Sequence, residues 1–340
     1  MTSAEVKALA KSLGADLVGI TSMDRFEGAP MQMDPRYIMP EAKSMIVMAF
    51  RVMRGSLRGI EEGTFFSNYS AMGYGGLTYL YIPMTVINLC KYIEDEGYEA
   101  IPLGHQSDWR AINNSGELKK DWSVPVEPGK PAPDIMIHLR IAAYLAGLGE
   151  IGYSKMFLTP EFGPRVRIGV VMTEMELEPD PIYEGPQLCN KCMACVKACP
   201  GDCISATETI KVNLAGHEVE WGDIDVKKCN DYFVGGRRVE EGEPAGDYES
   251  EYRPGITRGP HTPFYHRPPK LYKSGQAVCG AAGCTRACMI SMEARGVVKN
   301  KFHTKFRRNR PWHVDWSENG NVTFLDNKEE AVDTIKNEAD

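Results

Sequence analysis

The chain has 340 residues, of which 43% are hydrophobic and 25% charged, a composition typical of folded globular proteins and long enough for two domains. Its formal net charge of −7 argues against a nucleic-acid-binding surface, which needs a basic stripe. It has no run of about 18 apolar residues and no secretory signal at its start, so we expect a cytoplasmic protein without a membrane span.

Strands alternate with helices over the first half of the chain, which predicts a mixed α/β domain over residues 1–178. The first helix is predicted over 2–14, because Thr2 and Glu5 have the spacing of a capping box and Gly14 follows the apolar face. The later elements are strands over 15–21 and 44–50, a helix over 77–96 with Pro83 near its start, a strand over 98–104, a loop over 106–134, a helix over 138–149 and a strand over 166–175.

A linker rich in proline and charge, 178–186, leads to a cysteine-rich region over 187–295. Within that region, residues 234–276 are rich in Gly, Pro, Arg and Tyr without periodicity, which predicts a long insertion loop. The tail, 296–340, contains the basic stretch KFHTKFRRNR, which is either solvated or contacts an acidic partner.

The ten cysteines indicate metal binding rather than disulfides, because a cytoplasmic compartment is reducing. The run CNKCMACVKACP has the CxxCxxCxxxCP spacing of bacterial ferredoxins. In that run three thiolates hold one [4Fe–4S] cluster and the fourth cysteine serves another, so a second cysteine group is required. By this analogy one cluster takes Cys189, Cys192, Cys195 and Cys288, and the other takes Cys199, Cys229, Cys279 and Cys284.

Zinc is the alternative metal, but structural zinc sites usually join two separate CxxC pairs, which this run does not resemble. The second group departs from the ferredoxin run, because four residues separate Cys279 from Cys284. Cys203 and Cys90 are left over, and Cys203 is expected to be a small buried side chain.

The α/β region contains none of the usual cofactor signatures. No GxGxxG follows a strand, there is no GxxxxGK[ST] loop, and the histidines have neither HExxH spacing nor the DxHxxG motif of histidine-coordinated cobalamin.

Several segments resemble corrinoid-dependent reductive dehalogenases, which are related to the epoxyqueuosine reductases. The longest is GLGEIGYSKMFLTPEFGPRVRIGVVMTEMELEPDPI, which begins at Gly147 and is followed by CNKCMACVKACP. DIDVKKCNDYF around Cys229, GYEAIPLGH ending at His105, and the N-terminal SLGADLVGI are similar in type. The resemblance covers roughly 1–20, 77–106, 138–235 and 279–289.

The resemblance implies a nitroreductase-like α/β domain that binds cobalamin base-off, followed by a ferredoxin-like domain with two [4Fe–4S] clusters. It implies an oxidoreductase of anaerobic metabolism that removes halogen from a small organohalide through Co(I) fed by the clusters. A ferredoxin or flavodoxin is the expected electron donor, and a homodimer is one possible assembly.

The family's proton donor is a tyrosine, and the matching segment TYLYIP offers Tyr79 and Tyr81. Tyr81 is favoured because Pro83 lies beside it, although both tyrosines are equally compatible with a core position. Arg165 or Arg167 would favour proton donation by its charge. The residues predicted to contact the corrinoid are His105, Gln106, Gly147, Gly149 and Arg167.

The sequence also departs from the family. Respiratory members carry a twin-arginine signal that this sequence lacks, and His105 and Gln106 stand where members often have Asn. An epoxyqueuosine-reductase-like enzyme, acting on tRNA with Asp134 as its acid, is the nearest alternative, although GLGE replaces the usual GLGWIGKN. A second alternative is an electron-transfer or corrinoid-activating partner whose clusters serve the cobalt of another protein.

Overall fold

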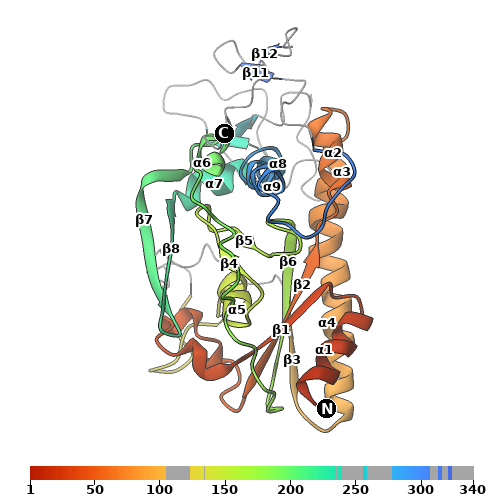
Figure 1. The fold of residues 1–340 in the computed structure, drawn as a ribbon. Coiled ribbons are helices and arrows are strands. Elements are labelled where there is room, and N and C mark those ends of the chain that lie inside the picture. Colours follow the sequence, from red (N-terminus) through yellow and green to blue (C-terminus); the bar gives the residue numbers. More distant parts are fainter. Residues whose placement is uncertain are drawn as a thin grey trace.

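A four-stranded sheet organises the N-terminal half of the protein in the computed structural model (Figure 1). The strands lie in the order β1-β2-β6-β3 and all three pairings are antiparallel. The predicted strands are confirmed, with small shifts at their ends. Their bounds are Leu17–Ser22 for β1, Ser44–Arg51 for β2, Ala100–Leu103 for β3 and Val166–Thr173 for β6.

The structure describes most of the chain, with gaps. The predicted site residues His105, Gln106 and Asp134 lie outside the described residues. Within the predicted insertion loop, 234–276, the structure describes two short strands that pair with each other, β9 (Gly236–Arg238) and β10 (Ile256–Arg258). The described residues are 1–104, 123–133, 135–233, 236–238, 256–258, 278–306, 313–315 and 321–323.

Alternate residues of β2 point to opposite faces of the sheet and belong to two different cores. Ile46, Met48 and Phe50 pack with helices α1, α4 and η4, which cover one face. Met45 and Val47 pack with α5 and the hairpin β7–β8, which cover the other. The mixed helix-and-sheet architecture is therefore confirmed. The covering elements are α1 (Ser3–Ser12), η4 (Tyr69–Tyr81), α4 (Ile82–Asp95), α5 (Leu139–Leu145), β7 (Ile204–Leu214) and β8 (His217–Ile224).

Helix α1 begins at the predicted capping box. The backbone N–H of Glu5 donates to the Thr2 hydroxyl at 3.3 Å, and the Glu5 carboxylate accepts from the Thr2 N–H at 2.7 Å. Two of the donors that every helix start leaves open are thereby satisfied. Val6 and Ala10 are fully buried, and Gly14 follows the helix with a φ of +120°, which favours glycine.

The helix predicted over 77–96 starts earlier than expected and has two parts. Its first part, η4, is a π-helix, in which hydrogen bonds join residues five apart. Gly73 lies in this wide turn, where an added Cβ would stand 2.8 Å from the Tyr69 ring. The second part, α4, is an ordinary α-helix with Pro83 in its first turn, as predicted.

The cysteine-rich region adds four helices that gather at one end of the molecule (Figure 1). It also contains the hairpin β7–β8, which the cysteine spacing does not predict. The hairpin turns through Ala215 and Gly216, both at positive φ, as a two-residue turn of the primed type requires. The helices are α6 (Ala194–Lys197), α7 (Val226–Phe233), α8 (Val278–Ala282) and α9 (Cys284–Ala294).

Helices α8 and α9 share a core with the N-terminal half. The buried cluster that contains Leu57 and the helical face of the sheet also contains Ala281, Ala282, Met289 and Ile290.

The remaining short elements that the structure describes are three single-turn helices, η1 (Met23–Phe26), η2 (Met31–Met33) and η3 (Pro35–Tyr37), the helices α2 (Gly55–Glu61) and α3 (Phe66–Asn68), and the strands β4 (Glu150–Ile151), β5 (Phe157–Leu158), β11 (His313–Asp315) and β12 (Asn321–Thr323).

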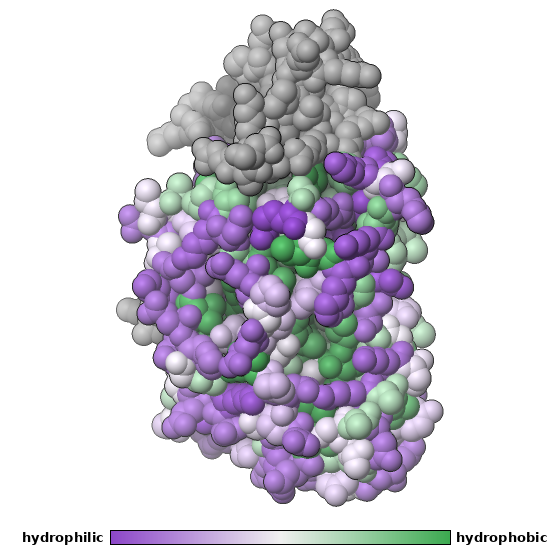
Figure 2. Space-filling view, in the orientation of Figure 1, coloured by the Kyte–Doolittle hydropathy of each residue, from purple (hydrophilic) through white to green (hydrophobic). Residues whose placement is uncertain are grey.

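The surface carries few continuous apolar areas on the face seen in Figure 2. Hydrophobic residues show mainly in hollows near the middle of that face, and hydrophilic residues cover most of the rest. Of the helices that the structure describes, none is both long and apolar enough to cross a bilayer.

Candidate functional site

The first two cysteines of the ferredoxin-like run lie on a loop with an unusual backbone, and the third, Cys195, lies in α6 directly after that loop. Lys191 and Met193, which flank Cys192, both have positive φ, at 53° and 59°. Each such residue costs on the order of 1–3 kcal/mol and persists only where its surroundings fix it. Here a neighbouring segment fixes the loop: the Glu150 carboxylate accepts from the Cys189 N–H at 3.1 Å. The loop is therefore held in a defined, strained shape around its thiols.

Helix α9 brings Cys288 to this loop. The Cys192 thiol and the Ser291 hydroxyl of α9 lie 3.4 Å apart. Burial raises the pKa of Cys288 well above its usual value, and the thiolates of Cys189, Cys195 and Cys192 raise it further. The four thiols assigned to the first cluster therefore lie close enough to affect one another's charge.

The second group gathers from more distant parts of the chain. Burial raises the pKa of Cys279, and the thiolates of Cys229, Cys284 and Cys199 add to that effect. Burial also raises the pKa of Cys284 to about 12, with Cys199 and Cys229 as the next causes. Cys284 and Cys288 stand one turn apart on the same face of α9, so this helix contributes one thiol to each group.

Cys203 and Cys90, the two spare cysteines, are both buried. Cys203, 3% exposed, donates its backbone N–H to the Cys199 sulfur at 3.4 Å. A hydrogen bond from the Cys203 thiol lowers the pKa of Cys199 to about 6. Burial in the helical core raises the pKa of Cys90 to about 12, which leaves it protonated at neutral pH.

The donor set suits iron–sulfur clusters, because it consists of thiols only, in two groups of four. All ten cysteines are free. As the described side chains are placed, no three of His, Cys, Asp or Glu stand close enough to hold a metal ion.

Three tyrosines follow one another at intervals of five along η4 and meet Arg167 of β6. Arg167 donates to the Tyr69 hydroxyl at 2.9 Å, and its guanidinium lies 4.5 Å from the centre of the Tyr74 ring. The Tyr74 and Tyr79 hydroxyls are 3.2 Å apart. Burial raises the pKa of Tyr74 more than the Arg167 charge lowers it. Tyr69 and Tyr74 are not among the predicted site residues, although their five-residue spacing matches the π-helical repeat.

Tyr81, the predicted donor, lies elsewhere. It is 48% exposed, and its hydroxyl donates to the Gly14 carbonyl at 3.4 Å at the end of α1. Its ring meets the edge of Phe50 with centroids 6.0 Å apart. The structure therefore brings Tyr79, and not Tyr81, into the group around Arg167.

The two predicted arginines have different surroundings although they are two residues apart. Arg165 is fully buried and donates to the Val52 carbonyl and to the Asn300 side chain, each at 2.8 Å. Burial lowers the pKa of Arg165 to about 10. Arg165 therefore joins the β2 end to the segment after α9, whereas Arg167 faces the tyrosines.

A small pocket connects these parts. Tyr69, Arg165, Arg167 and Thr285 all line it, and Thr285 directly follows Cys284 on α9. The Nε atoms of both arginines are buried and have no hydrogen-bond partner among the described residues. The pocket therefore combines a phenol and two incompletely paired guanidinium groups beside the second cysteine group.

A further group of cations borders that cysteine group. Burial lowers the pKa of Arg140 and the Arg167 charge adds to this, while the thiolates of Cys229 and Cys284 oppose it. Burial lowers the pKa of Lys155 to about 8, with Arg140 as the next cause. Arg140 is therefore near enough to Arg167 and to the thiols of Cys229 and Cys284 for their charges to act on it.

The predicted glycines have a structural role of their own. A Cβ on Gly147 would stand 2.1 Å from the Pro181 carbonyl oxygen, and one on Gly149 would stand 2.0 Å from that of Leu158. Both residues also have positive φ, at 73° and 152°. Packing within the protein thus explains both glycines, and their identity gives no support to a corrinoid contact.

Comparison with known proteins identifies relatives, although no family model matches the chain. The chain is 25% identical over 265 residues to the tetrachloroethene reductive dehalogenase of Sulfurospirillum multivorans, covering 67% of this chain and 46% of that protein. It is 44% identical over 102 residues to the tetrachloroethene reductive dehalogenase of Desulfitobacterium hafniense, covering 27% and 18%. The epoxyqueuosine reductase of Gloeobacter violaceus is 23% identical over 264 residues, covering 71% and 68%.

Among solved structures, the catabolic reductive dehalogenase NpRdhA aligns with a TM-score of 0.45 and 19% identity, covering 91% of this chain and 38% of that one. The epoxyqueuosine reductase from Streptococcus thermophilus aligns with a TM-score of 0.39 and 20% identity, covering 59% and 52%. The chain spans less than half the length of the reductive dehalogenases it matches. The relationship rests on the sequence matches, which confirm the resemblance seen in the sequence.

Proposed function

We propose that this chain, a relative of the reductive dehalogenases and the epoxyqueuosine reductases, is a corrinoid-dependent iron–sulfur reductase. The proposal includes two [4Fe–4S] clusters, a base-off cobalamin and a small organohalide as substrate. It also includes the predicted division into an α/β domain, 1–178, and a ferredoxin-like domain, 187–295. A ferredoxin or flavodoxin is the proposed electron donor.

One observation carries the proposal: helix α9 bears two of the eight thiols assigned to the clusters, and the residue after Cys284 lines the pocket that the Tyr69 phenol also lines. Cys288 belongs to the first group and Cys284 to the second, and Thr285 between them lines the pocket. Electrons need a continuous route from cluster to cluster and then to the reacting centre. A single helix that touches both thiol groups and the pocket supports such a route.

The chain's own residues then have distinct tasks. The eight thiols hold the clusters, and Arg140 offsets part of the negative charge of the second group. When bound, the corrinoid supplies a strongly nucleophilic cobalt centre, and the clusters supply its electrons. Arg167, with His105 and Gln106, is proposed to contact the corrinoid.

Tyr69 is the proton donor that the geometry favours. Because Arg167 donates to the Tyr69 oxygen, the hydroxyl hydrogen of Tyr69 is left to point toward another acceptor. The same hydrogen bond stabilises the negative charge that remains on the oxygen after the proton leaves. The Tyr79 hydroxyl lies beside that of Tyr74, and the Tyr81 hydroxyl donates instead to the Gly14 carbonyl.

Two other functions have specific support. An epoxyqueuosine-reductase-like enzyme is favoured by the match to the Gloeobacter violaceus protein, which covers 68% of that protein. In that case Asp134 would donate the proton. An electron-transfer partner is favoured by the thiol groups alone, since these need no corrinoid in the same chain.

The deciding experiment is anaerobic purification from cells supplied with cobalamin, followed by iron, sulfide and corrinoid analysis. We expect about eight irons and eight sulfides per chain and one tightly bound corrinoid. The Co(II) EPR signal should lack nitrogen hyperfine splitting from a histidine. Cys192→Ala should remove one cluster signal and leave the other.

Other outcomes point to the alternatives. Eight irons without cobalt would favour the electron-transfer partner. Stoichiometric zinc without a low-potential EPR signal would exclude both the corrinoid-dependent iron–sulfur reductase and the electron-transfer partner. Reduction of epoxyqueuosine-containing tRNA, with organohalides unchanged, would favour the tRNA enzyme.

A further inference from the structure

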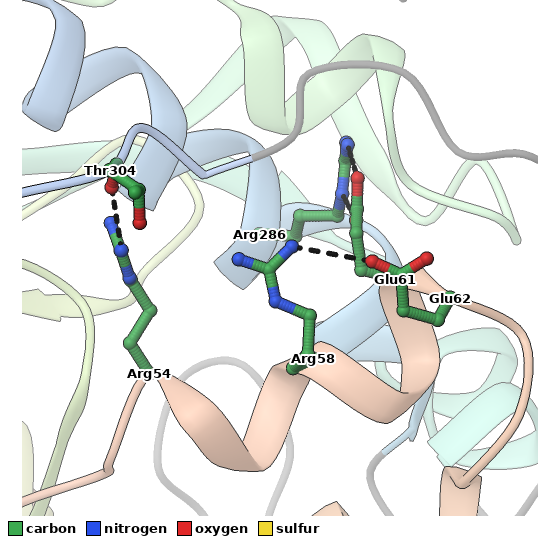
Figure 3. A network of polar contacts seen from close by, with 6 residues as sticks. All are labelled: Arg54, Arg58, Glu61, Glu62, Arg286 and Thr304. Carbon is green, nitrogen blue, oxygen red and sulfur yellow. Dashed lines mark hydrogen bonds and ion pairs between the residues drawn. The ribbon is translucent and has the colours of Figure 1, made fainter.

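Two ion pairs connect helix α2 of the N-terminal half to the cysteine-bearing helix α9. Arg286 donates to both carboxylate oxygens of Glu61, from Nε at 2.6 Å and from Nη2 at 2.9 Å (Figure 3). Both side chains are buried, at 2% and 0% exposed. Arg54 pairs with Glu293 at 2.9 Å, also with little exposure.

The two pairs have a regular register. Arg54 and Glu61 are seven residues apart at the two ends of α2, and Arg286 and Glu293 are seven residues apart on α9. Seven residues make about two helical turns, so each helix presents both charges on one face. The first charge of one helix meets the last charge of the other, which fixes both the axial position and the relative direction of the two helices.

These charges are unfavourable for the helices that carry them. Arg54 and Arg286 stand near helix N-termini, and Glu61 and Glu293 near C-termini, where the macrodipole prefers the opposite sign. A buried ion pair also adds little net stability, because desolvation cancels most of its attraction. Neither helix formation nor overall stability accounts for the four charges, whereas specific positioning does.

Arg286 lies midway between two cluster thiols. Cys284 and Cys288 are four residues apart and share a face of α9, and Arg286 points about 200° away from each. The contact with Glu61 therefore lies on the face of α9 opposite to the face that carries the two thiols. A rotation of α9 about its axis would move both thiols and would break the two hydrogen bonds of Arg286.

We propose that Arg54, Glu61, Arg286 and Glu293 form a two-point clamp that sets the rotation and axial position of α9. The clamp thereby positions Cys284 in the second thiol group and Cys288 in the first. These four are positioning residues, and the consequence for the clusters rests on the proposed function. The consequence for the thiols of the metal-free protein does not.

The test replaces the buried pair with apolar side chains of similar size, in the double variant Glu61→Leu/Arg286→Met. Such replacements commonly preserve folding, and this one removes no net charge. The matched control is Arg58→Met/Glu62→Leu, which removes a 3.5 Å ion pair between two residues four apart, one on α2 and one directly after it. Midpoint potentials of both clusters are measured by EPR-monitored titration, with thermal unfolding as the measure of stability.

We expect the double variant to unfold near the parent temperature but to have shifted potentials for both clusters, while the control has the parent's potentials. Unshifted potentials in a folded double variant would overturn the clamp. If the double variant does not fold, Glu293→Gln, at the less buried pair, takes its place and should give a smaller shift of both potentials. Unshifted potentials in folded Glu293→Gln would overturn the clamp equally.

A second measurement separates failure of the clamp from failure of the proposed function. In metal-free protein, the alkylation rates of Cys284 and Cys288 are measured by mass spectrometry and compared with that of Cys189 on the loop. We expect several-fold changes at both α9 thiols in the double variant and none at Cys189. Unchanged rates at all three thiols would overturn the clamp even if the protein holds no cluster.

Discussion

The two thiol groups are built in different ways. The first takes three cysteines from one short segment, 189–195, whose loop is fixed by left-handed residues and by the Glu150 carboxylate and continues into α6. The second takes its cysteines from the end of that run and from α7, α8 and α9, so it exists only when distant segments pack together. Three of the four thiols assigned to the first group therefore come from one short segment and Cys288 comes from a distant helix, whereas the four thiols assigned to the second group come from four separate segments.

The same difference separates the two tyrosine candidates. Tyr81 is favoured by its neighbours in the sequence alone. Tyr69 is favoured by its contact with Arg167, which lies 98 positions away. Substitutions that remove long-range contacts should therefore affect function most, and substitutions that change local structure should affect only stability.

The largest effect is expected from Tyr69→Phe. The change keeps the ring and its packing but removes the acidic hydrogen, so turnover should fall by roughly 10²–10⁴ while both cluster signals and bound corrinoid remain. Tyr81→Phe is the matched control and should turn over normally. Steady-state assays with cluster EPR on the same samples would check both variants.

Two results would change the assignment. Loss of turnover in Tyr81→Phe alone would restore the donor that the sequence favours. Normal turnover in both variants together with an inactive Asp134→Asn would favour the epoxyqueuosine-type mechanism.

The next effect tests the difference between the thiol groups directly. An added Cβ at Gly283 would stand 2.5 Å from the Ala198 carbonyl oxygen and 2.7 Å from Pro200, so α9 must move away from the Cys199 segment. Gly283→Ala should lose the second cluster first and keep about four irons per chain, because the forced movement begins beside Cys284 and the Cys199 segment, whereas Cys288 lies one helical turn further along α9. Iron analysis with EPR would measure this loss.

The control for this variant is Gly280→Ala. There the new Cβ would meet the Thr285 hydroxyl at 3.2 Å, on a side chain that can move, and the Cys284 sulfur at 3.9 Å, which is an ordinary van der Waals distance. Equal loss of both clusters in Gly283→Ala would show that the groups are not independently built.

Local sequence signals were sufficient for the sheet and its first helix. The apolar run of β2, the capping box of Thr2 and Glu5, and Gly14 each specify their element within a few residues. The ferredoxin-like spacing likewise identified the thiols of the first loop. The grouping of those thiols by cluster remains a prediction.

The features that sequence reasoning missed depend on geometry that no short motif specifies. An α-helical repeat puts Tyr79 and Tyr81 on opposite faces, but the π-helix of η4 instead aligns tyrosines at intervals of five. Arg165 and Arg167 are indistinguishable in GPRVR, and only the packing of β6 gives them different partners. The hairpin β7–β8 was detectable in principle from alternating residues around Ala215 and Gly216.

A third effect concerns Lys155, a partly buried lysine whose pKa is lowered by burial and further by the charge of Arg140. Burial lowers the pKa of Lys155 from 10.5 to about 8, so the folded protein binds fewer protons than the unfolded chain between those pH values. The resulting penalty on folding is complete below about pH 8 and disappears as the pH approaches 10.5. At neutral pH it corresponds to roughly 3 kcal/mol.

Lys155→Met removes the charge and keeps a side chain able to pack on Trp221, where the ammonium now lies 4.8 Å from the ring centre. The variant should be more stable than the parent at pH 7, and the two should converge near pH 10.5. Denaturant unfolding at several pH values would measure the difference. A constant difference at every pH would mean that packing, and not charge, is responsible.

The smallest effect is expected where structure is most local. Thr2→Ala removes the hydroxyl that caps α1 and the partner of Glu5, which should cost about 1 kcal/mol of stability. Ser3→Ala, one residue later, is the control for the loss of a hydroxyl. Because α1 packs on β1 and α4, Thr2→Ala should leave iron content and both cluster signals unchanged. Gly283→Ala should do the reverse, losing a cluster for little change in the unfolding of the sheet. If Thr2→Ala also altered the clusters, the sheet and the thiol groups would behave as one cooperative unit, and the contrast between local and long-range construction would not hold.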